Sequence, residues 1–165
     1  MSTATTPMVI VLMGVSSSGK STIGLKLAEL LRWPFRDADS FHPPANIAKM
    51  SRGIPLEDAD RWPWLSRLNK ELKQFEHAVL ACSALKASYR ERLAQGLKDF
   101  RIVYLHGARG LIHARMQSRS HFMPAALLES QFAALEPPAD AIAIDVAAAP
   151  SACVAEIVAR LQQKL

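Results

Sequence analysis

Short, continuously apolar runs recur along the chain, and most of them are bounded by glycine, proline or charged residues. The first runs from Val9 to Met13 and ends directly at Gly14. Runs of this length without polar alternation are typical of strands that are buried on both faces of a parallel sheet. We therefore predict five strands, at residues 9–13, in the stretch that ends with Asp37, and at residues 78–82, 102–105 and 141–146.

Helical periodicity fills the intervals between these runs. In the first interval Ile23, Leu27 and Leu30 recur at the spacing of one helix face, and Trp33-Pro34 ends the pattern. The same reasoning predicts helices near residues 20–31, 44–50, 64–75, 86–95, 110–117, 125–135 and 151–161. Strands that alternate with helices in this way predict a three-layer α/β fold with a five-stranded parallel sheet.

The length and composition indicate a single domain. The chain has 165 residues, of which 50% are hydrophobic, which is enough for one buried core and too few residues for two ordinary domains. We expect residues 1–165 to form that domain and residues 1–7 to be disordered. The apolar run at residues 8–13 is far shorter than a signal peptide core or a membrane span, so we expect a cytoplasmic protein without membrane contact. Cys82 and Cys153 lack metal-site spacing and are expected to be buried free thiols.

The charge distribution leaves two kinds of partner open. The formal net charge is +5 and the pI is about 9.5, yet the 20 lysines and arginines form no concentrated basic run. Such an excess of positive charge suits a small anionic substrate as well as a nucleic acid. Composition alone does not separate these two.

A phosphate-binding motif follows the first predicted strand and precedes the first predicted helix. Residues 14–21, Gly14-Val15-Ser16-Ser17-Ser18-Gly19-Lys20-Ser21, fit the pattern G-x-x-x-x-G-K-[ST], and Thr22 follows them. The two glycines allow the backbone to curl so that its N–H groups point at phosphate oxygens, at the positive end of the helix. We predict that this loop binds ATP, that Lys20 bridges the β and γ phosphates and that Ser21 binds Mg²⁺. The alternative is a serine-rich turn before a helix.

Two carboxylates stand where the second strand should end. In a parallel α/β sheet the ligand crevice lies outside the carboxyl ends of the strands, so Asp37 and Asp39 should face the phosphates. We predict that Asp39 accepts the proton of an attacking hydroxyl group and that Asp37 lies on the metal side. The alternative is an acidic turn that caps the next helix.

Three blocks together resemble the gluconate kinase (gluconokinase) family. They are the phosphate-binding motif, the block from Asp37 to Met50, which reads D-x-D-x-x-H-P-x-x-N-I-x-K-M, and the block from Gly53 to Leu65. The segment Cys82-Ser83-Ala84-Leu85-Lys86 with Tyr89-Arg90 and the stretch from His121 to Pro137 resemble further family blocks. Ser120 departs from the pattern, because a glycine is expected there, and the stretch after it is short.

The resemblance implies a function that the pattern alone does not. It implies transfer of phosphate from ATP to D-gluconate with Mg²⁺, which gives 6-phosphogluconate. It also implies a P-loop fold like that of shikimate and adenylate kinases with a short lid, and a homodimer.

Several cations are candidates for binding the anions. Lys86 and Arg90 lie four residues apart after the third strand, and they could clamp a sugar-acid carboxylate or form a solvated basic face. Arg115 and Arg119 have the same spacing before the predicted lid, where we expect one of them to close over the transferred phosphoryl group. His42 is a candidate substrate ligand or a brace for its loop. Around Gly53, the candidates for meeting the substrate are Lys49, Arg52 and Arg61, of which we select Arg52.

Two rival functions remain at this stage. A kinase for shikimate or a nucleoside monophosphate would use the same phosphate-binding loop. A nucleotide-gated switch or a nucleic-acid-binding regulator would also use it, but the chain has no separate effector domain and no basic stripe, so we expect no nucleic acid partner.

Overall fold

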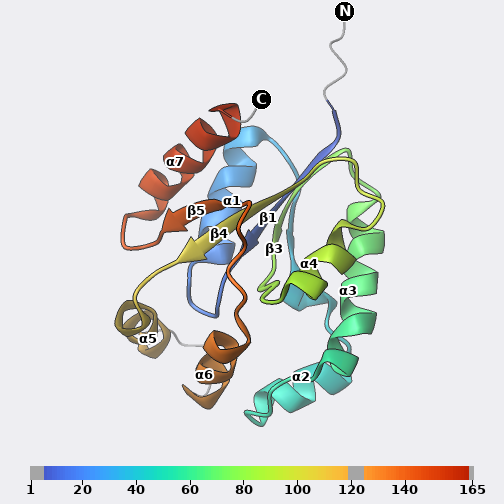
Figure 1. Ribbon diagram of the computed structural model, residues 1–165, viewed down its shortest axis with the longest axis vertical. Helices are drawn as coiled ribbons and strands as arrows, with labels where there is room; N and C mark the ends of the chain where they lie inside the picture. The colour runs from blue at the N-terminus through green and yellow to red at the C-terminus, as the bar shows by residue number, and fades with distance from the viewer. Residues whose placement is uncertain (1–5, 119–124, 164–165) are drawn as a thin grey trace, which may run out of the picture.

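The computed structural model describes residues 6–118 and 125–163 and shows one parallel sheet between two layers of helices (Figure 1). The strand order is β2-β3-β1-β4-β5, and every pair of neighbours is parallel. The strands are β1 (Met8–Met13), β2 (Phe35–Asp37), β3 (His77–Ala81), β4 (Phe100–His106) and β5 (Ile142–Asp145). The predicted fold class is confirmed.

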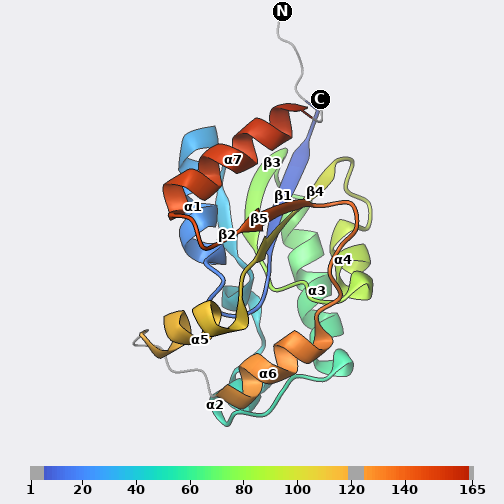
Figure 2. The ribbon, with the colours of Figure 1, turned by 60° about the vertical axis from the view of Figure 1, so that its left-hand side comes forward.

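Seven α-helices and a short 3₁₀ helix are described. They are α1 (Lys20–Leu31), η1 (Ala38–Phe41), α2 (Pro44–Ser51), α3 (Asp58–Leu72), α4 (Ala87–Ala94), α5 (Arg109–Gln117), α6 (Ala125–Ala134) and α7 (Pro150–Gln163). Helices α1 and α7 cover one face of the sheet and α3 and α4 cover the other, while α2, α5 and α6 gather beyond the carboxyl ends of the strands (Figures 1 and 2). None of the described helices combines the length and the apolar character needed to cross a membrane.

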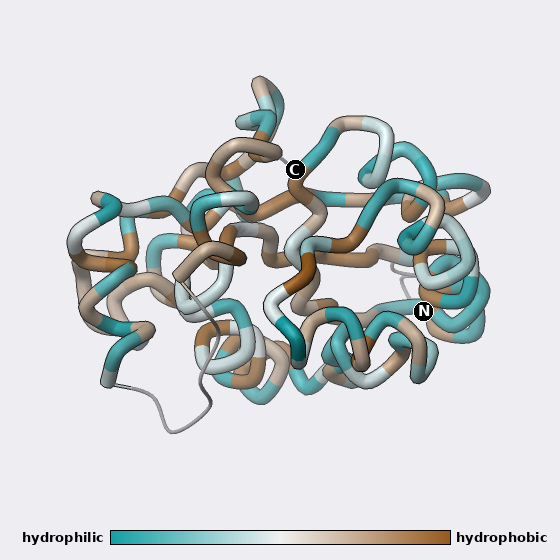
Figure 3. The backbone as a smooth tube through the Cα atoms, turned by 90° about the horizontal axis from the view of Figure 1, so that it is seen from below, coloured by the Kyte–Doolittle hydropathy of each residue, from teal (hydrophilic) through white to brown (hydrophobic). Residues whose placement is uncertain are grey.

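The two faces of β1 supply two separate cores. Val9, Val11 and Met13 pack toward α3 and α4, whereas Ile10 and Leu12 pack toward α1 and α7. All five side chains are at most 3% exposed, which explains why the run lacks polar alternation. Hydrophobic, brown stretches run through the middle of the molecule in Figure 3.

Close packing fixes α1 against the sheet. A Cβ atom on Gly24 would lie 2.7 Å from Cε2 of Phe35 and 2.9 Å from Cδ1 of Leu12, so any larger residue there would displace these side chains. Since α1 begins directly after the phosphate-binding motif, this packing also holds the start of the helix at the carboxyl end of β1.

Two elements differ from the prediction. Helix α3 begins at Asp58 and not at Trp64, because Glu57 and Asp60 form a reciprocal capping box and Pro63 lies within the helix without ending it. The residues after β2 form η1, in which the Asp37 side chain accepts a hydrogen bond from the Asp39 N–H. Residues 6–7 have no regular secondary structure, and residues 1–5 lie outside the described part of the chain.

Candidate functional site

A cavity of about 270 Å³ lies at the carboxyl ends of the strands. The phosphate-binding motif forms one side of it, η1 and the start of α3 form the opposite side, and α6 contributes Leu127, Ser130 and Gln131. A second cavity next to it shares Leu56, Arg61 and Gln131 with the first and extends to Lys86. The site therefore has room for an elongated ligand.

The phosphate-binding motif is shaped by its own backbone. Gly14 is required because a Cβ atom there would lie 2.7 Å from the Leu105 carbonyl oxygen and 2.7 Å from Oγ of Ser18. The Gly14 N–H donates to the Ser83 carbonyl, 3.3 Å away, which ties the loop to the end of β3. Lys20 Nζ donates to the carbonyl oxygens of Gly14 (3.1 Å) and Val15 (2.9 Å), so the ammonium group lies inside the curl of the loop.

Of the remaining loop residues, some pack in the protein interior and others line the main cavity. Val15 is buried in a small core under α5 and α6. The Ser18 hydroxyl is buried, and among the described residues it has no hydrogen-bond partner. Ser16, Ser17 and Gly19 line the main cavity. Such a curl with a lysine at its centre suits the phosphates of a nucleotide.

Two hard oxygen ligands meet beside the loop. The Ser21 hydroxyl donates to Oδ2 of Asp37 at 2.9 Å, at the junction of α1 and β2. The same carboxylate accepts the Asp39 N–H through Oδ1 at 3.0 Å. The capping role that was the alternative reading of Asp37 is therefore present together with the contact expected of a metal-side residue. Magnesium prefers such oxygen ligands, together with phosphate oxygens, so these residues fit a Mg²⁺ ion.

Asp39 faces the cavity across from Lys20. Its side chain lies in the recess between the loop and α3, so protein surrounds it although solvent reaches it through the open cavity. Removal of water by the surrounding protein raises the pKa of Asp39, the positive charge of Lys20 lowers it, and the negative charge of Asp37 raises it again. The net direction is upward, which is the direction that suits a proton acceptor.

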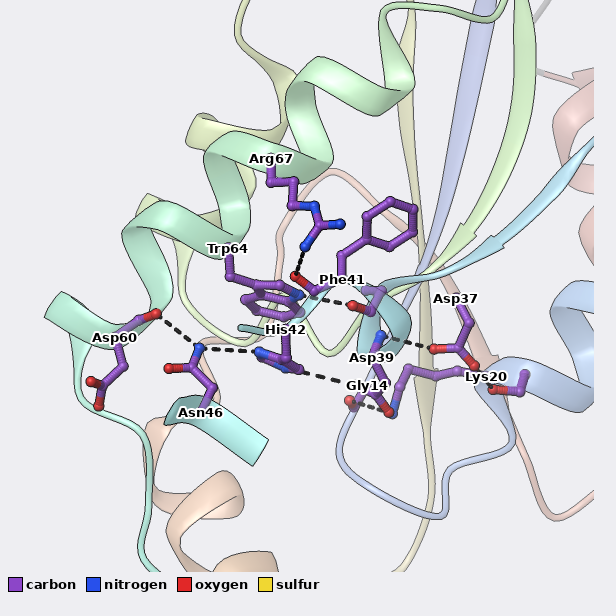
Figure 4. Close-up of polar contacts among 12 residues, drawn as sticks. Gly14, Lys20, Asp37, Asp39, Phe41, His42, Asn46, Asp60, Trp64 and Arg67 are labelled. Carbon is purple, nitrogen blue, oxygen red and sulfur yellow. Dashed lines mark hydrogen bonds and ion pairs between the residues drawn. The ribbon is translucent and has the colours of Figure 1, made fainter. Parts of the chain in front are cut away.

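His42 is held in one orientation (Figure 4). Its ring stacks on Trp64 with a centroid distance of 4.1 Å and an interplanar angle of 15°, and Nδ1 lies 3.2 Å from Nδ2 of Asn46. Trp64 is itself fixed, because its Nε1–H donates to the Ala38 carbonyl at 2.8 Å. Burial, and secondly the charge of Arg61, lower the pKa of His42 to about 4, so the ring is neutral near pH 7.

Arg61 is the arginine of α3 that reaches the main cavity. Its guanidinium donates to the Leu56 carbonyl at 2.6 Å and to the Tyr89 hydroxyl at 3.2 Å. Tyr89 in turn donates to Asp58, whose pKa is lowered first by that bond and then by the bond from Lys86. The sequence singled out Arg61 only as one of three cations near Gly53, and Arg52, the one selected, ends α2 at the exposed surface.

Lys86 and Arg90 do not share one environment, although they are four residues apart. Lys86 Nζ pairs with Asp58 at 3.2 Å and lines the second cavity. Arg90 donates to three main-chain carbonyls, those of Ala84 (2.8 Å), Leu85 (3.1 Å) and Glu136 (2.9 Å). These contacts fasten the β3–α4 loop to the segment after α6.

Gln131 of α6 was not anticipated as a site residue. Its Oε1 accepts a hydrogen bond from the Ser16 N–H at 2.6 Å, and the residue lines both cavities. The sequence carried no motif that links position 131 to position 16, because the contact depends on how α6 packs.

A third cavity lies on the far side of the loop. It is lined by Ser17, Ser18 and Thr22 of the loop and α1, by Arg115 of α5 and by Pro150 of α7. Arg115 therefore lies at the opposite side of the loop from Asp39. Arg119, the other predicted lid arginine, lies outside the described residues, as do Ser120 and His121.

Both cysteines are buried free thiols, as the sequence predicts. Cys82 borders the main cavity at the end of β3, and burial raises the pKa of its thiol to about 12. A thiol in that state is not a nucleophile near neutral pH.

The chain is similar to known proteins in sequence and in structure. Residues 16–162 match the family model described as shikimate kinase. A probable gluconokinase of Xenopus tropicalis is 43% identical, over 96% of this chain and 95% of that protein. The thermosensitive gluconokinase of Escherichia coli (strain K12) is 50% identical, over 82% of this chain and 78% of that protein. A crystal structure of a gluconokinase from Sinorhizobium meliloti 1021 superimposes with a TM-score of 0.88 at 45% identity, over 95% of this chain and 93% of that chain.

Proposed function

The chain belongs to the gluconokinase family, and from that premise we propose that it transfers the γ-phosphoryl group of ATP to D-gluconate, forming 6-phospho-D-gluconate. The observation that carries the proposal is the composition of one cavity. A phosphate-binding loop with Lys20 lies opposite Asp39, His42 and Arg61, which offer a proton acceptor, a neutral ring and a cation. A polyhydroxylated acid has hydroxyl groups and a carboxylate to match all three.

The donor side supplies charge and main-chain hydrogen bonds. The loop N–H groups other than those of Gly14, Ser16 and Ser18, which donate within the protein, would neutralise the phosphates together with the Lys20 ammonium group. Thr22 continues this surface toward the third cavity. We assign the nucleotide base to that third cavity, where Arg115 offers a planar cation against which a base can stack. Of the two predicted lid arginines, this leaves Arg119 for the phosphoryl group.

The acceptor side supplies the proton acceptor and the groups that orient the substrate. Asp39 would accept the proton of the attacking hydroxyl group, and its raised pKa improves its strength as a base. We propose Arg61 as the first cation for the gluconate carboxylate, with Lys86 further out at the second cavity. Lys86, Arg90 and Arg52 stay predictions as substrate ligands, and the three carbonyl contacts of Arg90 favour a supporting role.

We assign the metal to the junction of α1 and β2. Ser21 and Asp37 would hold Mg²⁺ together with phosphate oxygens, and the ion would offset phosphate charge there. A cytoplasmic homodimer completes the proposal, on the strength of the family resemblance.

A panel of acceptors tests the proposed function. Purified protein with MgATP is offered gluconate, shikimate and nucleoside monophosphates, and ADP formation is measured by a coupled assay. We expect turnover with gluconate to exceed turnover with each of the others by at least about 10²-fold, because a site that hydrogen-bonds its substrate rejects molecules that leave those groups unpaired. A preference for shikimate or for a nucleotide acceptor would refute the assignment.

A further inference from the structure

A chain of three groups runs from α3 through α2 to the main cavity. It consists of the Asp60 carbonyl oxygen, the Asn46 side-chain amide and the His42 ring (Figure 4). Asn46 and His42 are only 2% and 8% exposed, so their polar atoms depend on one another and not on solvent.

The donor and the acceptor of each hydrogen bond among these three groups follow from their chemistry. A carbonyl oxygen can only accept, so the amide atom that lies 3.0 Å from the Asp60 carbonyl oxygen must be the Asn46 nitrogen Nδ2. The same nitrogen lies 3.2 Å from Nδ1 of His42 and can only donate. His42 Nδ1 must therefore offer its lone pair, and the proton of the neutral ring is on Nε2.

Asp60, the first of the three hydrogen-bonded residues, is itself held in place. The Asp60 carboxylate accepts from Lys49 Nζ at 2.8 Å and from the Glu57 N–H at 2.9 Å, which holds the first turn of α3 in place. The Asn46 amide cannot reverse without placing its oxygen against the Asp60 carbonyl oxygen. The tautomer of His42 is thus determined by the position of a main-chain group on another helix.

Burial first, and then the charge of Arg61, lower the pKa of His42 and favour the neutral ring, whereas a carboxylate such as that of Asp39 attracts the protonated one. Trp64 stacks on one face, and the positive charge of Arg61 on α3 opposes protonation. The carboxylate of Asp39 on η1 faces the other nitrogen, with Oδ1 at 3.9 Å from Nε2. That distance is too long for a direct hydrogen bond, yet one hydroxyl oxygen can lie within hydrogen-bond distance of both atoms.

We propose that Asn46 is a positioning residue that holds His42 in its Nε2–H tautomer, so that this N–H donates to an acceptor hydroxyl group whose own proton faces Asp39. The identity of the acceptor as gluconate rests on the proposed function, whereas the tautomer does not. A neutral N–H donor beside a carboxylate acceptor recognises a hydroxyl group, which both accepts and donates. The pair thereby orients the hydroxyl oxygen for attack on the phosphoryl group.

The first test reads the tautomer directly. Protein with ¹⁵N-labelled histidine is examined by NMR at pH 7, and the His42 signals are assigned by their loss in His42→Gln. We expect the wild-type ring to be protonated on Nε2 alone, and Asn46→Asp to place a proton on Nδ1, because a carboxylate accepts where the amide donated. A wild-type ring protonated on Nδ1, or an unchanged tautomer in a folded Asn46→Asp variant, would overturn the proposal.

The second test uses paired substitutions of His42, which remain informative if Asn46→Asp does not fold. The amide nitrogen of His42→Gln can reach the position of Nε2, whereas that of His42→Asn reaches only the position of Nδ1. We expect the KM for gluconate to rise less than about threefold in His42→Gln and about tenfold or more in His42→Asn, the size of one lost hydrogen bond with an unpaired buried partner. The affinity for an ATP analogue should be unchanged in both.

His113→Gln serves as the control, since His113 pairs with Glu129 away from the cavity. Equal effects in His42→Gln and His42→Asn would refute the donor role. A wild-type enzyme that ignores gluconate but phosphorylates another polyol would refute the proposed function alone, because the same comparison would then be made with that polyol.

Discussion

The donor side and the acceptor side of the cavity are built in different ways. The donor side uses consecutive residues from Gly14 to Ser21, and its shape comes from backbone conformation and from contacts of main-chain atoms. The acceptor side uses side chains from η1, α2 and α3, each held by a side chain or carbonyl of another element. One side is local in the sequence, and the other exists only in the folded protein.

This difference separates what the two sides can do. A loop of main-chain N–H groups binds any phosphate chain, because every residue carries the same donor. A network of side chains recognises one arrangement of hydroxyl and carboxylate groups, because each atom has one partner and one direction. We therefore expect changes on the donor side to abolish turnover for every acceptor, and changes on the acceptor side to act on a particular step or substrate.

The largest effect is expected from Lys20→Ala on the donor side. In the proposed reaction the ammonium group supports phosphate charge in the transition state, so its loss should lower kcat by about 10³-fold, the upper range for one electrostatic donor. The melting temperature should stay close to that of the wild type, because the Lys20 ammonium group lies within the loop, where it donates to the carbonyl oxygens of Gly14 and Val15, and is not part of the described hydrophobic cores. Retention of more than about a tenth of the wild-type rate would contradict the role of the loop.

Asp39→Asn tests the point where the two sides meet. Loss of the base should lower kcat for gluconate by about 10²-fold, with little change in ATP affinity. The wild-type rate should also fall as the pH drops through the raised pKa of Asp39, above the ordinary value of 3.8, because only the carboxylate accepts a proton. This acid limb should be absent in Asp39→Asn.

A magnesium titration of Asp39→Asn decides between two roles. A lost base leaves kcat low at every Mg²⁺ concentration. Recovery of kcat at high Mg²⁺ would instead make Asp39 a metal-side residue and would leave the proton acceptor unidentified.

Arg61→Met should affect the acceptor side alone. Loss of a charge-assisted contact to the carboxylate is expected to raise the KM for gluconate by about tenfold or more, while the KM for ATP stays within about twofold. Arg67→Met is the matched control, because Arg67 lies on the same helix at the exposed surface and contacts Phe41. A parallel rise in the KM for ATP would mean that Arg61 serves the donor side.

Arg90→Met tests whether Arg90 stabilises the protein or binds the substrate. The change removes the side-chain donor of three carbonyl groups, of which that of Leu85 keeps the Glu136 N–H at 2.8 Å, so it should destabilise the protein by about 2 kcal/mol, the usual size for hydrogen bonds to a charged group. Thermal unfolding measures this loss, with the surface variant Lys98→Met for comparison. A KM for gluconate that rises more than about tenfold without loss of stability would restore Arg90 as a substrate ligand.

Lys86→Met should have the smallest effect. Lys86 forms a partly exposed ion pair with Asp58, and such pairs contribute about 0–1 kcal/mol. We expect the KM for gluconate to change by less than about threefold, measured beside Arg61→Met in the same assay. A tenfold rise would place the carboxylate in the second cavity and not beside Arg61.

The sequence predicted the local structure of the donor side well, because the information for that structure is local. The motif, the strand before it and the helix after it lie within residues 8–31, and α1 has the bounds that were predicted. The acceptor side was predicted only in part. Asp39 and His42 follow from their place after β2, but nothing in the local pattern shows that Asn46 bonds to His42 or that Gln131 reaches Ser16.

The start of α3 shows why a local pattern can mislead. Pro63 and Trp62 interrupt the apolar periodicity, so the helix was predicted to begin after them, yet the Glu57–Asp60 capping box starts it earlier. That first turn carries Asp60 and Arg61, so the sequence analysis included Arg61 among its candidates but did not place it, or the Asp60 carbonyl group, on a helix beside the cavity. The pair of acidic residues three apart was the signal that could have located them.

The central position of β1 has a consequence for folding. β1 pairs with β3 and β4, so Val9 has strand neighbours on both sides only when the segments that contain Ala78 and Phe100 have joined the sheet. These contacts are distant in sequence, and such pairings form late because the entropy of closing long loops opposes them. We therefore expect the phosphate-binding loop, although it comes early in the sequence, to take its shape late in folding. A variant that ends before residue 106 should accordingly bind no nucleotide.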